Sequence, residues 1–198
     1  MHAMDMLDNI AKHSITVCHL AMSLADRLNM HEVHLDHRLV RASALLHDIT
    51  KTRSLTTHEN HAHTGSLVLT NLGYPEVGTI VGQHVRLPDD FISRFPDEAA
   101  IVHYADKRVL HDHVVSLDDR MSYIQERYGR KPENLRRIHE TWNMVRVLEH
   151  RLCEALSTTP DNLRDLVSSE KVNDDLYLYH TLSVPARDMT YAPTERIP

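Results

Sequence analysis

Apolar residues in the first part of the chain recur at steps of three and four, a pattern typical of amphipathic helices. Within residues 5–29 this stripe consists of Ile10, Val17, Leu20, Ala21, Leu24 and Leu28. His13 lies inside the stripe, three residues after Ile10 and four before Val17. A histidine there could be a core residue that bonds to the backbone or a metal ligand, and this stretch leaves both readings open.

The next segment is apolar almost throughout, from Leu39 to Leu46, and ends in His47 and Asp48. Asp36 can cap the helix that this segment predicts. A helix that is apolar nearly all round is expected to be a buried central helix. An imidazole and a carboxylate at its end are unfavourable unless something pairs with them. A bound cation would do so, and the negative C-terminal end of a helix also favours it.

Further helices follow at short intervals. Residues 52–59 are polar without a period and predict a loop, and a helix over residues 60–72 then ends at Gly73. His61 lies in the first turn of this helix. Gly65, with the serine after it, would allow a neighbouring segment to approach closely.

Pro75 suits the first position of a fourth helix, in which His84 shares one face with apolar residues. Residues 86–96 contain two prolines and predict a loop. In the helix that follows, Asp106 lies in the middle of an apolar face. A buried carboxylate needs a partner, which is either a basic side chain or a cation.

The C-terminal half is predicted to consist mainly of helices that contribute to the packing of the fold. Ser116 with Asp119 resembles a capping box for a helix that ends at Gly129. A long helix over residues 132–156 carries its apolar residues on one side, and a short helix to about residue 167 follows Pro160.

The final residues, 168–198, lack a helical period and contain three prolines, which predicts a largely irregular tail. Residues 176–179 (Leu-Tyr-Leu-Tyr) could dock on the body or on a second subunit, which would make a homodimer. The sequence leaves both open.

Composition narrows the class of protein. A chain of 198 residues suits one domain with a substantial core, and the low aromatic and glycine content favours an all-α fold. The net charge of −6 and the absence of a long basic run argue against a nucleic-acid groove.

The expected compartment is the cytoplasm. Cys18 and Cys153 are far apart without a CxxC partner, so reduced thiols are expected. The N-terminus carries acidic residues where a signal peptide would have lysines and an apolar run, and no stretch approaches the ~20 apolar residues of a membrane span. No membrane partner is therefore expected.

Several potential metal ligands occur at inward positions of successive predicted helices. They are His13, His47, Asp48, His61, His84 and Asp106. Four buried histidines and two carboxylates would be hard to satisfy without a cation. Imidazole and carboxylate suit iron, manganese or zinc, and a carboxylate can bridge two metals. Two metals about 3.5–4 Å apart can activate a water for attack on phosphorus.

The order and context of these residues resemble the HD-domain superfamily of metal-dependent phosphohydrolases. His13-Ser14-Ile15-Thr16-Val17 resembles the first motif, H-S-x-x-V, and residues 45–51 (LLHDITK) resemble L-L-H-D-I-x-K. Residues 104–107 (YADK) resemble the final A-D motif, and His61 and His84 look like the extra histidines of binuclear members. The resemblance implies an all-α HD-domain helical bundle, with the motif core at residues 13–110, the domain at 1–157 and a C-terminal extension of unknown role at 158–198.

The resemblance also implies roles. His13, His47 and Asp106 would bind one metal, His61 and His84 would complete a second, and Asp48 would bridge them and share catalysis with Lys51. Iron or manganese is favoured, with zinc, nickel or magnesium compatible. Lys51 would contact a substrate phosphate, Arg86 could reach it, and a metal-activated water would be the nucleophile. Lys107 and Arg108 follow a ligand on a helix and are expected to point away.

The expected activity is hydrolysis of a nucleotide or another small phosphate ester. The ligand set and compact size are similar to di-iron HD hydrolases of diadenosine tetraphosphate, whereas the GYP signature of cyclic-dinucleotide phosphodiesterases is missing. Two alternatives stay open. Some HD-domain proteins with the same ligands resemble mixed-valent di-iron oxygenases, and others are non-catalytic regulatory modules, although those usually have eroded ligands.

Overall fold

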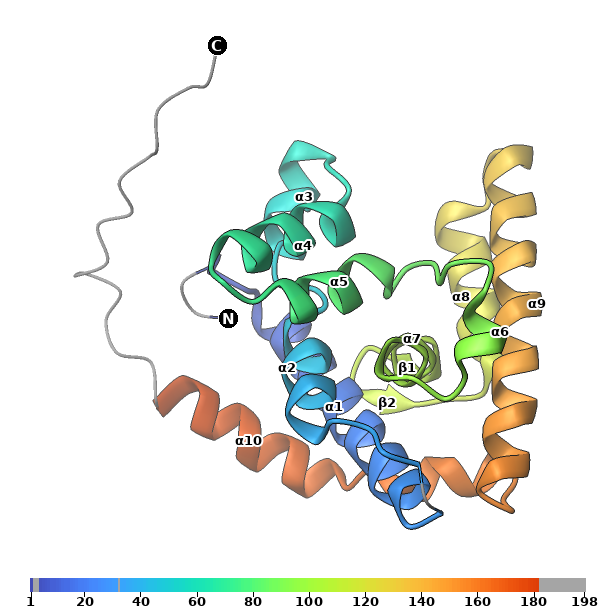
Figure 1. Ribbon diagram of the computed structural model, residues 1–198. Coiled ribbons are helices and arrows are strands. Elements are labelled where there is room, and N and C mark those ends of the chain that lie inside the picture. Colours follow the sequence, from blue (N-terminus) through green and yellow to red (C-terminus); the bar gives the residue numbers. More distant parts are fainter. Residues whose placement is uncertain (2–3, 32, 182–198) are drawn as a thin grey trace.

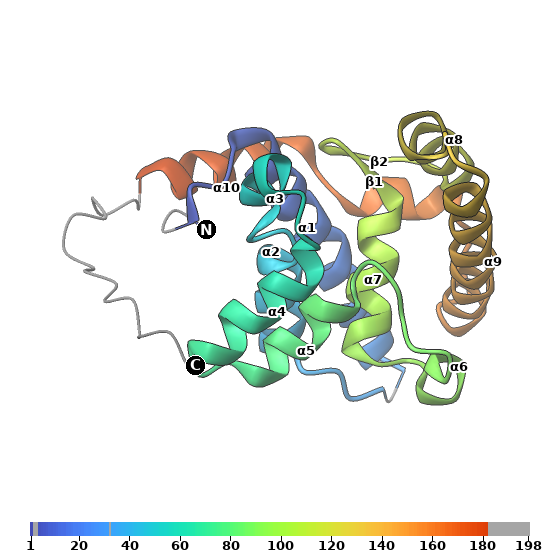
Figure 2. The same ribbon diagram turned by 90° about the horizontal axis from the view of Figure 1, so that it is seen from above.

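The computed structural model describes residues 1, 4–31 and 33–181, and it is helical apart from one small antiparallel sheet. The predicted all-α bundle is confirmed. Helix α7 lies in the middle, with α1, α2 and α5 on one side and α9 on the other (Figures 1 and 2). The first part of the fold, up to residue 108, consists of helices α1 (Asp8–Asn29), α2 (His37–Leu46), α3 (Lys51–Thr57), α4 (His61–Asn71), α5 (Pro75–Gln83), α6 (Phe91–Arg94) and α7 (Glu98–Arg108).

The second part begins with a short hairpin, β1 (Val109–Leu110) and β2 (His113–Val114), paired antiparallel. It continues through α8 (Leu117–Tyr128), α9 (Pro132–Ala155), a 3-10 helix η2 (Asp161–Leu166) and α10 (Ser169–Thr181). Helices α8 and α9 pack against each other and form one side of the molecule, and α10 returns to lie against α1 (Figure 1).

The most buried helix is α7, not α2. Every residue from Ala99 to Arg108 is buried, whereas α2 buries Val40, Ser43 and Ala44 and leaves its leucines half exposed. The prediction that the apolar segment before His47 forms the central helix was therefore wrong. Helix α7 is enclosed because α1, α2, α5 and α9 contact it from different sides.

Polar caps fix several helix starts as predicted. The carboxylate of Asp36 accepts from the backbone N–H groups of Arg38 and Leu39, and the side chain of Ser116 accepts from Asp119. The amide oxygen of Asn60 does the same at the start of α4. Such bonds satisfy donors that the first turn of a helix leaves free. Gly73, which ends α4, has a φ of 90°, a value that glycine adopts without strain.

Four elements differ from the sequence prediction. The predicted loop over residues 52–59 is mostly helix α3, which buries no residue and therefore has no apolar stripe to detect. The short helix α6 lies in the predicted loop over residues 86–96, and the β1–β2 hairpin was not predicted. The predicted irregular tail begins with α10, whose only buried residue is Val172. Residues 182–198 lie outside the described part.

The segment 176–179 belongs to α10, which docks on the body through α1. An ion pair of 2.8 Å joins His19 of α1 to Asp175 of α10. Tyr177 and Leu178 remain exposed. The homodimer stays a prediction.

Of the helices that the structure describes, none is both long and apolar enough to cross a lipid bilayer.

Candidate metal centre

Two of the predicted ligands are the C-terminal caps of helices. His47 follows the last residue of α2, and His84 follows the last residue of α5. The last carbonyl groups of a helix have no partner within the helix. The Nδ1 atom of His47 lies 2.8 Å from the carbonyl oxygen of Ala44, and Nδ1 of His84 lies 2.6 Å from that of Val81. Each ring is thus held by a carbonyl three residues earlier.

These bonds decide which ring nitrogen is free. A carbonyl oxygen only accepts, so Nδ1 must carry the proton and donate it, and in a neutral imidazole Nε2 is then an unprotonated lone pair. His13 is held the same way, because its Nδ1 lies 2.8 Å from the carbonyl oxygen of His111. Three histidines therefore present bare Nε2 atoms, which is how metal-binding histidines are usually oriented.

The Nε2 atoms of two of these histidines face a carboxylate. Nε2 of His13 lies 3.1 Å from Oδ1 of Asp106, and Nε2 of His47 lies 3.7 Å from the same oxygen. Nε2 of His47 is also 3.5 Å from Oδ2 of Asp48. Lone pairs of nitrogen and oxygen repel one another unless a proton or a metal ion lies between them. This first group of donors therefore calls for a cation.

A second group shares the carboxylate of Asp48. Its Oδ1 atom lies 3.1 Å from Nε2 of His61 and 3.6 Å from Nε2 of His84. The two histidine nitrogens are 3.2 Å apart. Asp48 thus faces both groups, with Oδ2 toward His47 and Oδ1 toward His61 and His84. Donor atoms of both trios, His13–His47–Asp48 and Asp48–His61–His84, lie close enough to hold one ion each.

Two atoms of the cluster are buried without a hydrogen-bond partner among the described residues. They are Nε2 of His47 and Oδ1 of Asp48. Buried polar atoms in proteins are nearly always paired, so one orphan atom in each donor group, His47 Nε2 in the first and Asp48 Oδ1 in the second, indicates a ligand in both. The donor set is also one that iron, manganese and zinc accept. The residues present therefore fit a metal centre.

The protonation states agree with this view. Burial lowers the pKa of His47 to about 4, so the ring is neutral at physiological pH. Burial alone would raise the pKa of Asp48, but the neighbouring His47, His61, His84 and Lys51 hold it well below its usual range. The pKa of Asp106 is likewise held low against burial, by Lys107, His13 and His47. Neutral imidazole and ionised carboxylate are the forms that bind metals.

The neighbouring turn is tied to α4. The hydroxyl of Thr50 donates to the carbonyl oxygen of His61 at 2.8 Å. At Gly65 a Cβ atom would lie 3.1 Å from Cγ1 of Val81 and 3.4 Å from Cγ2 of Ile49. The predicted close approach at Gly65 is thus confirmed, and it brings α4 and its His61 against the turn that carries Asp48.

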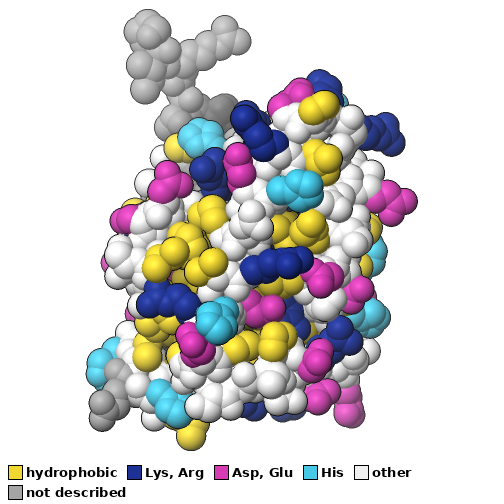
Figure 3. All heavy atoms as spheres, turned by 90° about the vertical axis from the view of Figure 1, so that its right-hand side faces the viewer, with side chains coloured by type: hydrophobic (Ala, Val, Ile, Leu, Met, Phe, Trp, Pro, Cys, Tyr) yellow, Lys and Arg dark blue, Asp and Glu magenta, His cyan; other side chains and the backbone are white. Residues whose placement is uncertain are grey.

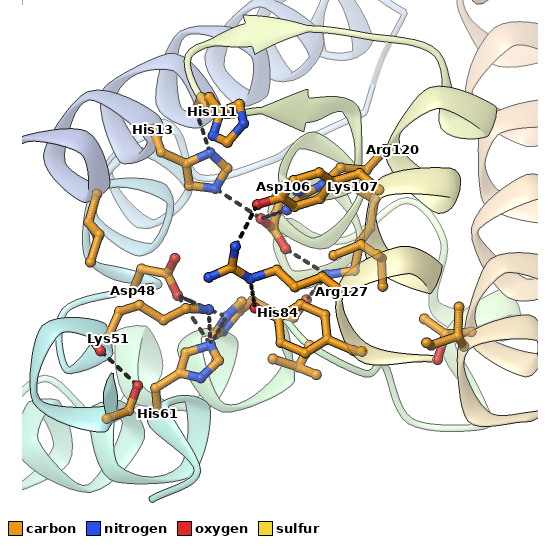
Figure 4. Close-up of a pocket in the computed structure, with 18 of the residues that line it drawn as sticks. His13, Asp48, Lys51, His61, His84, Asp106, Lys107, His111, Arg120 and Arg127 are labelled. Carbon is orange, nitrogen blue, oxygen red and sulfur yellow. Dashed lines mark hydrogen bonds and ion pairs between the residues drawn. The ribbon is translucent and has the colours of Figure 1, made fainter. Parts of the chain in front are cut away.

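The cluster lies in a cavity of about 790 Å³ (Figure 4). Lys51 and His61 lie on one side of the cavity and the arginines of α8 on the opposite side. Its lining contains two carboxylates, Asp48 and Asp106, and five basic side chains: Lys51, Lys107, Arg120, Arg127 and Arg137. A chain with a net charge of −6 thus surrounds this cavity with positive charge, which favours an anionic ligand.

The structure brings together the six predicted metal ligands and Lys51. The Nζ atom of Lys51 lies 3.3 Å from Nε2 of His61 and 3.6 Å from Oδ1 of Asp48. Arg86 is different. Its side chain is exposed, lies 3.5 Å from Asp89 and is not part of the cavity lining. Its role in binding substrate stays a prediction.

Lys107 does not point away from the site, and that expectation was wrong. Its Nζ atom donates to Oδ2 of Asp106 at 2.6 Å and to the carbonyl oxygen of His84 at 3.0 Å. The side chain is long enough to turn back along α7. Oδ2 of Asp106 thus accepts from a basic partner, while its Oδ1 presents lone pairs toward Nε2 of His13. Arg108 does point away, into the contact with α9.

Sequence reasoning missed the contribution of the chain after α7. Arg120, Tyr123 and Arg127 of α8 and Arg137 of α9 line the cavity. Their spacing on α8 marks one helix face but does not say what that face covers. The carbonyl oxygen of His111, which orients His13, carries no side-chain signal at all.

Comparison with known proteins agrees with this geometry. The HD domain family matches residues 10–109. Over 146 residues, 66% of this chain and 84% of the other, the sequence is 27% identical to an uncharacterized protein of Methanocaldococcus jannaschii. No solved structure matches with significance. The chain belongs to the HD-domain family, within a superfamily of metal-dependent hydrolases.

Proposed function

We propose that the protein is a metal-dependent phosphohydrolase that cleaves a nucleotide or another small phosphate ester at a binuclear site. The observation that carries the proposal is the position of the two donor trios. They share Asp48 and open into a cavity where basic side chains outnumber carboxylates five to two. Metals together with surrounding cations match a phosphate group, which is an anion that metals polarise.

The residues divide into three tasks. His13, His47 and Asp106 would hold one metal, His61 and His84 the other, and Asp48 both. When bound, such a pair supplies Lewis acidity and a water of lowered pKa. Iron or manganese suits these ligands.

Lys51 and Lys107 would hold the substrate. Lys51 is half-buried at the edge of the second donor trio, and Lys107 is bonded to the outer oxygen of Asp106. Both ammonium groups lie where they can neutralise non-bridging phosphate oxygens. The lowered pKa values of Asp48 and Asp106 keep both carboxylates ionised and available as ligands.

The cavity volume argues for more than an inorganic anion. About 790 Å³ lies within the range of roughly 300–1,000 Å³ that is typical of pockets for drug-sized ligands. Apolar and aromatic groups, among them Ile10, Ile124 and Tyr128, line the cavity beside the charges. A nucleotide, with a flat base and a phosphate, fits such a mixed lining.

The test is a turnover screen on untagged protein reconstituted anaerobically with Fe(II) or Mn(II). The panel contains mononucleotides, dinucleoside polyphosphates, cyclic nucleotides and simple phosphate esters, with products read by chromatography. We expect phosphate release without oxygen that is lost in Asp48→Ala. The Asp112→Ala variant is the control, because Asp112 pairs with Lys12 at 2.8 Å instead of joining the cluster.

If protein that holds two metals hydrolyses none of the substrates in the panel, the proposal is wrong. Oxygen consumption by the same preparation would then identify an oxygenase of the HD-domain type. Turnover that persists in Asp48→Ala would also contradict the proposal, since the shared ligand would be dispensable.

A further inference from the structure

The cavity has a second wall that lies outside the part of the chain matched by the HD-domain family. That match ends at residue 109, whereas α8 and α9 begin at Leu117 and Pro132. These two helices contribute a large share of the lining: Arg120, Tyr123, Ile124, Arg127, Tyr128, Arg137, Ile138, Thr141 and Trp142. We call this set the α8–α9 wall.

Arginines form a row along α8 within this wall. Arg120 and Arg127 are seven residues apart, so they share one helix face, and a rise of 1.5 Å per residue separates them by about 10 Å. Tyr123 lies between them on the same face. Arg120 is at the end near the metal centre, since one of its terminal nitrogens lies 4.0 Å from Oδ1 of Asp106. The row thus leads from the metal centre outward.

The arginines in this wall are poorly matched by acidic groups. Within the described ranges neither Arg127 nor Arg137 forms an ion pair with a carboxylate; Arg127 donates to the hydroxyls of Tyr128 at 3.2 Å and Tyr123 at 3.4 Å. Elsewhere on α9, outside the cavity lining, Arg136 pairs with Glu140 and Arg146 pairs with Asp118 of α8. The outer surface over α8 and α9 mixes both charges with apolar groups (Figure 3). Arg127 and Arg137 therefore bring to the cavity positive charge that no carboxylate of the described residues neutralises in an ion pair.

Arg120 supplies a second observation that points to a ligand. Its side chain is 13% exposed, and its Nε atom is buried without a hydrogen-bond partner among the described residues. The N–H of a guanidinium is a strong donor, and leaving it unpaired in a buried place is unfavourable. An oxygen anion bound beside the Arg120 guanidinium would satisfy it.

We infer that the α8–α9 wall is a second anion subsite, which holds phosphoryl groups of the substrate beyond the one that is cleaved. This inference rests on the proposed function. Arg120 approaches a predicted metal ligand, with a terminal nitrogen 4.0 Å from Oδ1 of Asp106, whereas the backbone of Arg127 lies about 10 Å farther along α8 and its side chain contacts Tyr123 and Tyr128. The row therefore selects a substrate with at least two linked phosphoryl groups over a phosphate monoester, and the tyrosines offer flat faces to the organic part.

The test measures binding rather than turnover. Titration calorimetry on metal-loaded protein compares adenosine monophosphate with adenosine 5′-(β,γ-methylene)triphosphate, which resists cleavage of its terminal bond. We expect the triphosphate analogue to bind at least ~10-fold more tightly, because each charge-assisted bond is worth about that factor. Metal content measured after each titration excludes stripping of the metals by the ligand.

Two double variants test whether the α8–α9 wall causes the preference for the triphosphate analogue over the monophosphate. Arg127→Gln with Arg137→Gln should remove most of the preference while affinity for the monophosphate changes less than about 3-fold. The control, Arg130→Gln with Arg136→Gln, changes the same charge on the same two helices outside the cavity lining. All four side chains are exposed, so folding should be retained.

An equal affinity for the two nucleotides, or a preference that survives in the first pair of variants, would overturn the inference. Hydrolysis of phosphate esters would stand in either case. Conversely, a wall-dependent preference in a protein without phosphohydrolase activity would keep the subsite and reject the proposed reaction.

Discussion

Helix α7 carries three buried charged residues, and two of them, Asp106 and Arg108, have opposite surroundings. Every nitrogen of the Arg108 guanidinium donates to a protein oxygen. The acceptors are the carbonyl oxygen of Val115 at 2.7 Å, the hydroxyl of Tyr104 at 2.7 Å, the carboxylate of Glu149 at 2.7 Å and the carbonyl oxygen of Pro160 at 2.9 Å. The donors around Asp106 and Asp48 instead face one another, with orphan atoms on His47 and Asp48.

The comparison distinguishes a buried charge that stabilises the fold from a buried cluster that can bind a ligand. A buried charge that the chain satisfies by itself contributes to folding, and its removal leaves a partner uncompensated. A buried cluster whose lone pairs converge is complete only with a ligand. Burial alone therefore does not identify a functional residue, because Arg108 is more buried than Asp106.

The largest effect is expected at Asp48. The Asp48→Asn variant keeps the size of the side chain but loses the charge shared by the two donor trios. We expect no more than one metal per chain and a loss of turnover of about 10³-fold or more. Metal analysis after gel filtration and kinetics on the reconstituted protein check this, and retention of two metals would remove the bridging role.

A change at Arg108 is expected to lower the folding stability of the protein, in contrast to the loss of metal and turnover expected at Asp48. The Arg108→Met variant leaves the half-buried Glu149 without its basic partner and with only the Tyr104 hydroxyl as donor among the described residues, which costs about 3–5 kcal/mol in the free energy of unfolding. Urea unfolding of the metal-free protein measures this loss. Adding Glu149→Met should restore most of the stability, and equal losses in the single and double variants would show that the ion pair is not what matters.

Acid should destabilise the metal-free protein before its carboxylates titrate. Burial lowers the pKa of His47 from 6.5 to about 4, so between these values the unfolded chain binds a proton that the folded chain does not. Stability therefore rises with pH through this window and is lost as the pH falls, with a slope of up to about 1.4 kcal/mol per pH unit for one such group.

Urea unfolding at several pH values between 4 and 7 should show this slope, and His47→Asn should make it shallower. The pKa values of Asp48 and Asp106 are held well below 3.8, so these groups contribute only at lower pH. A slope that His47→Asn leaves unchanged would assign the acid sensitivity to other groups.

The smallest effect is expected at Lys51, because it would touch the substrate and not hold the metals. Lys51→Met should retain both metals and lower kcat/KM by about 10–100-fold, the worth of one hydrogen bond to a charged group. Arg53→Met on the same helix is the control, since Arg53 pairs with Glu59 outside the cavity lining. Unchanged kinetics in Lys51→Met would remove this lysine from the mechanism.

The sequence predicted the parts of the molecule that depend on local pattern. Helix ends at Asp36, Gly73 and Ser116 follow from capping chemistry, and the residues of the donor trios stood out because polar groups interrupted apolar stripes. What the sequence could not predict depends on tertiary placement. The return of Lys107 toward Asp106 requires a long side chain to bend along its own helix, and the α8–α9 wall requires knowledge of which face of α8 meets the cavity.

Two helices, α3 and α10, were also missed because they bury almost no side chain. Helix α3 buries nothing and α10 buries one residue, so neither leaves an apolar period in the sequence.

The bond from Arg108 to the carbonyl oxygen of Pro160 has a consequence for how the chain can be divided. The expected boundary between residues 157 and 158 would separate this acceptor from the helix that carries Asp106. A protein shortened at that point would leave a buried guanidinium donor unpaired two residues from Asp106, a predicted metal ligand. The C-terminal extension therefore stabilises the helix that carries Asp106, and the two parts are expected to unfold as one cooperative unit.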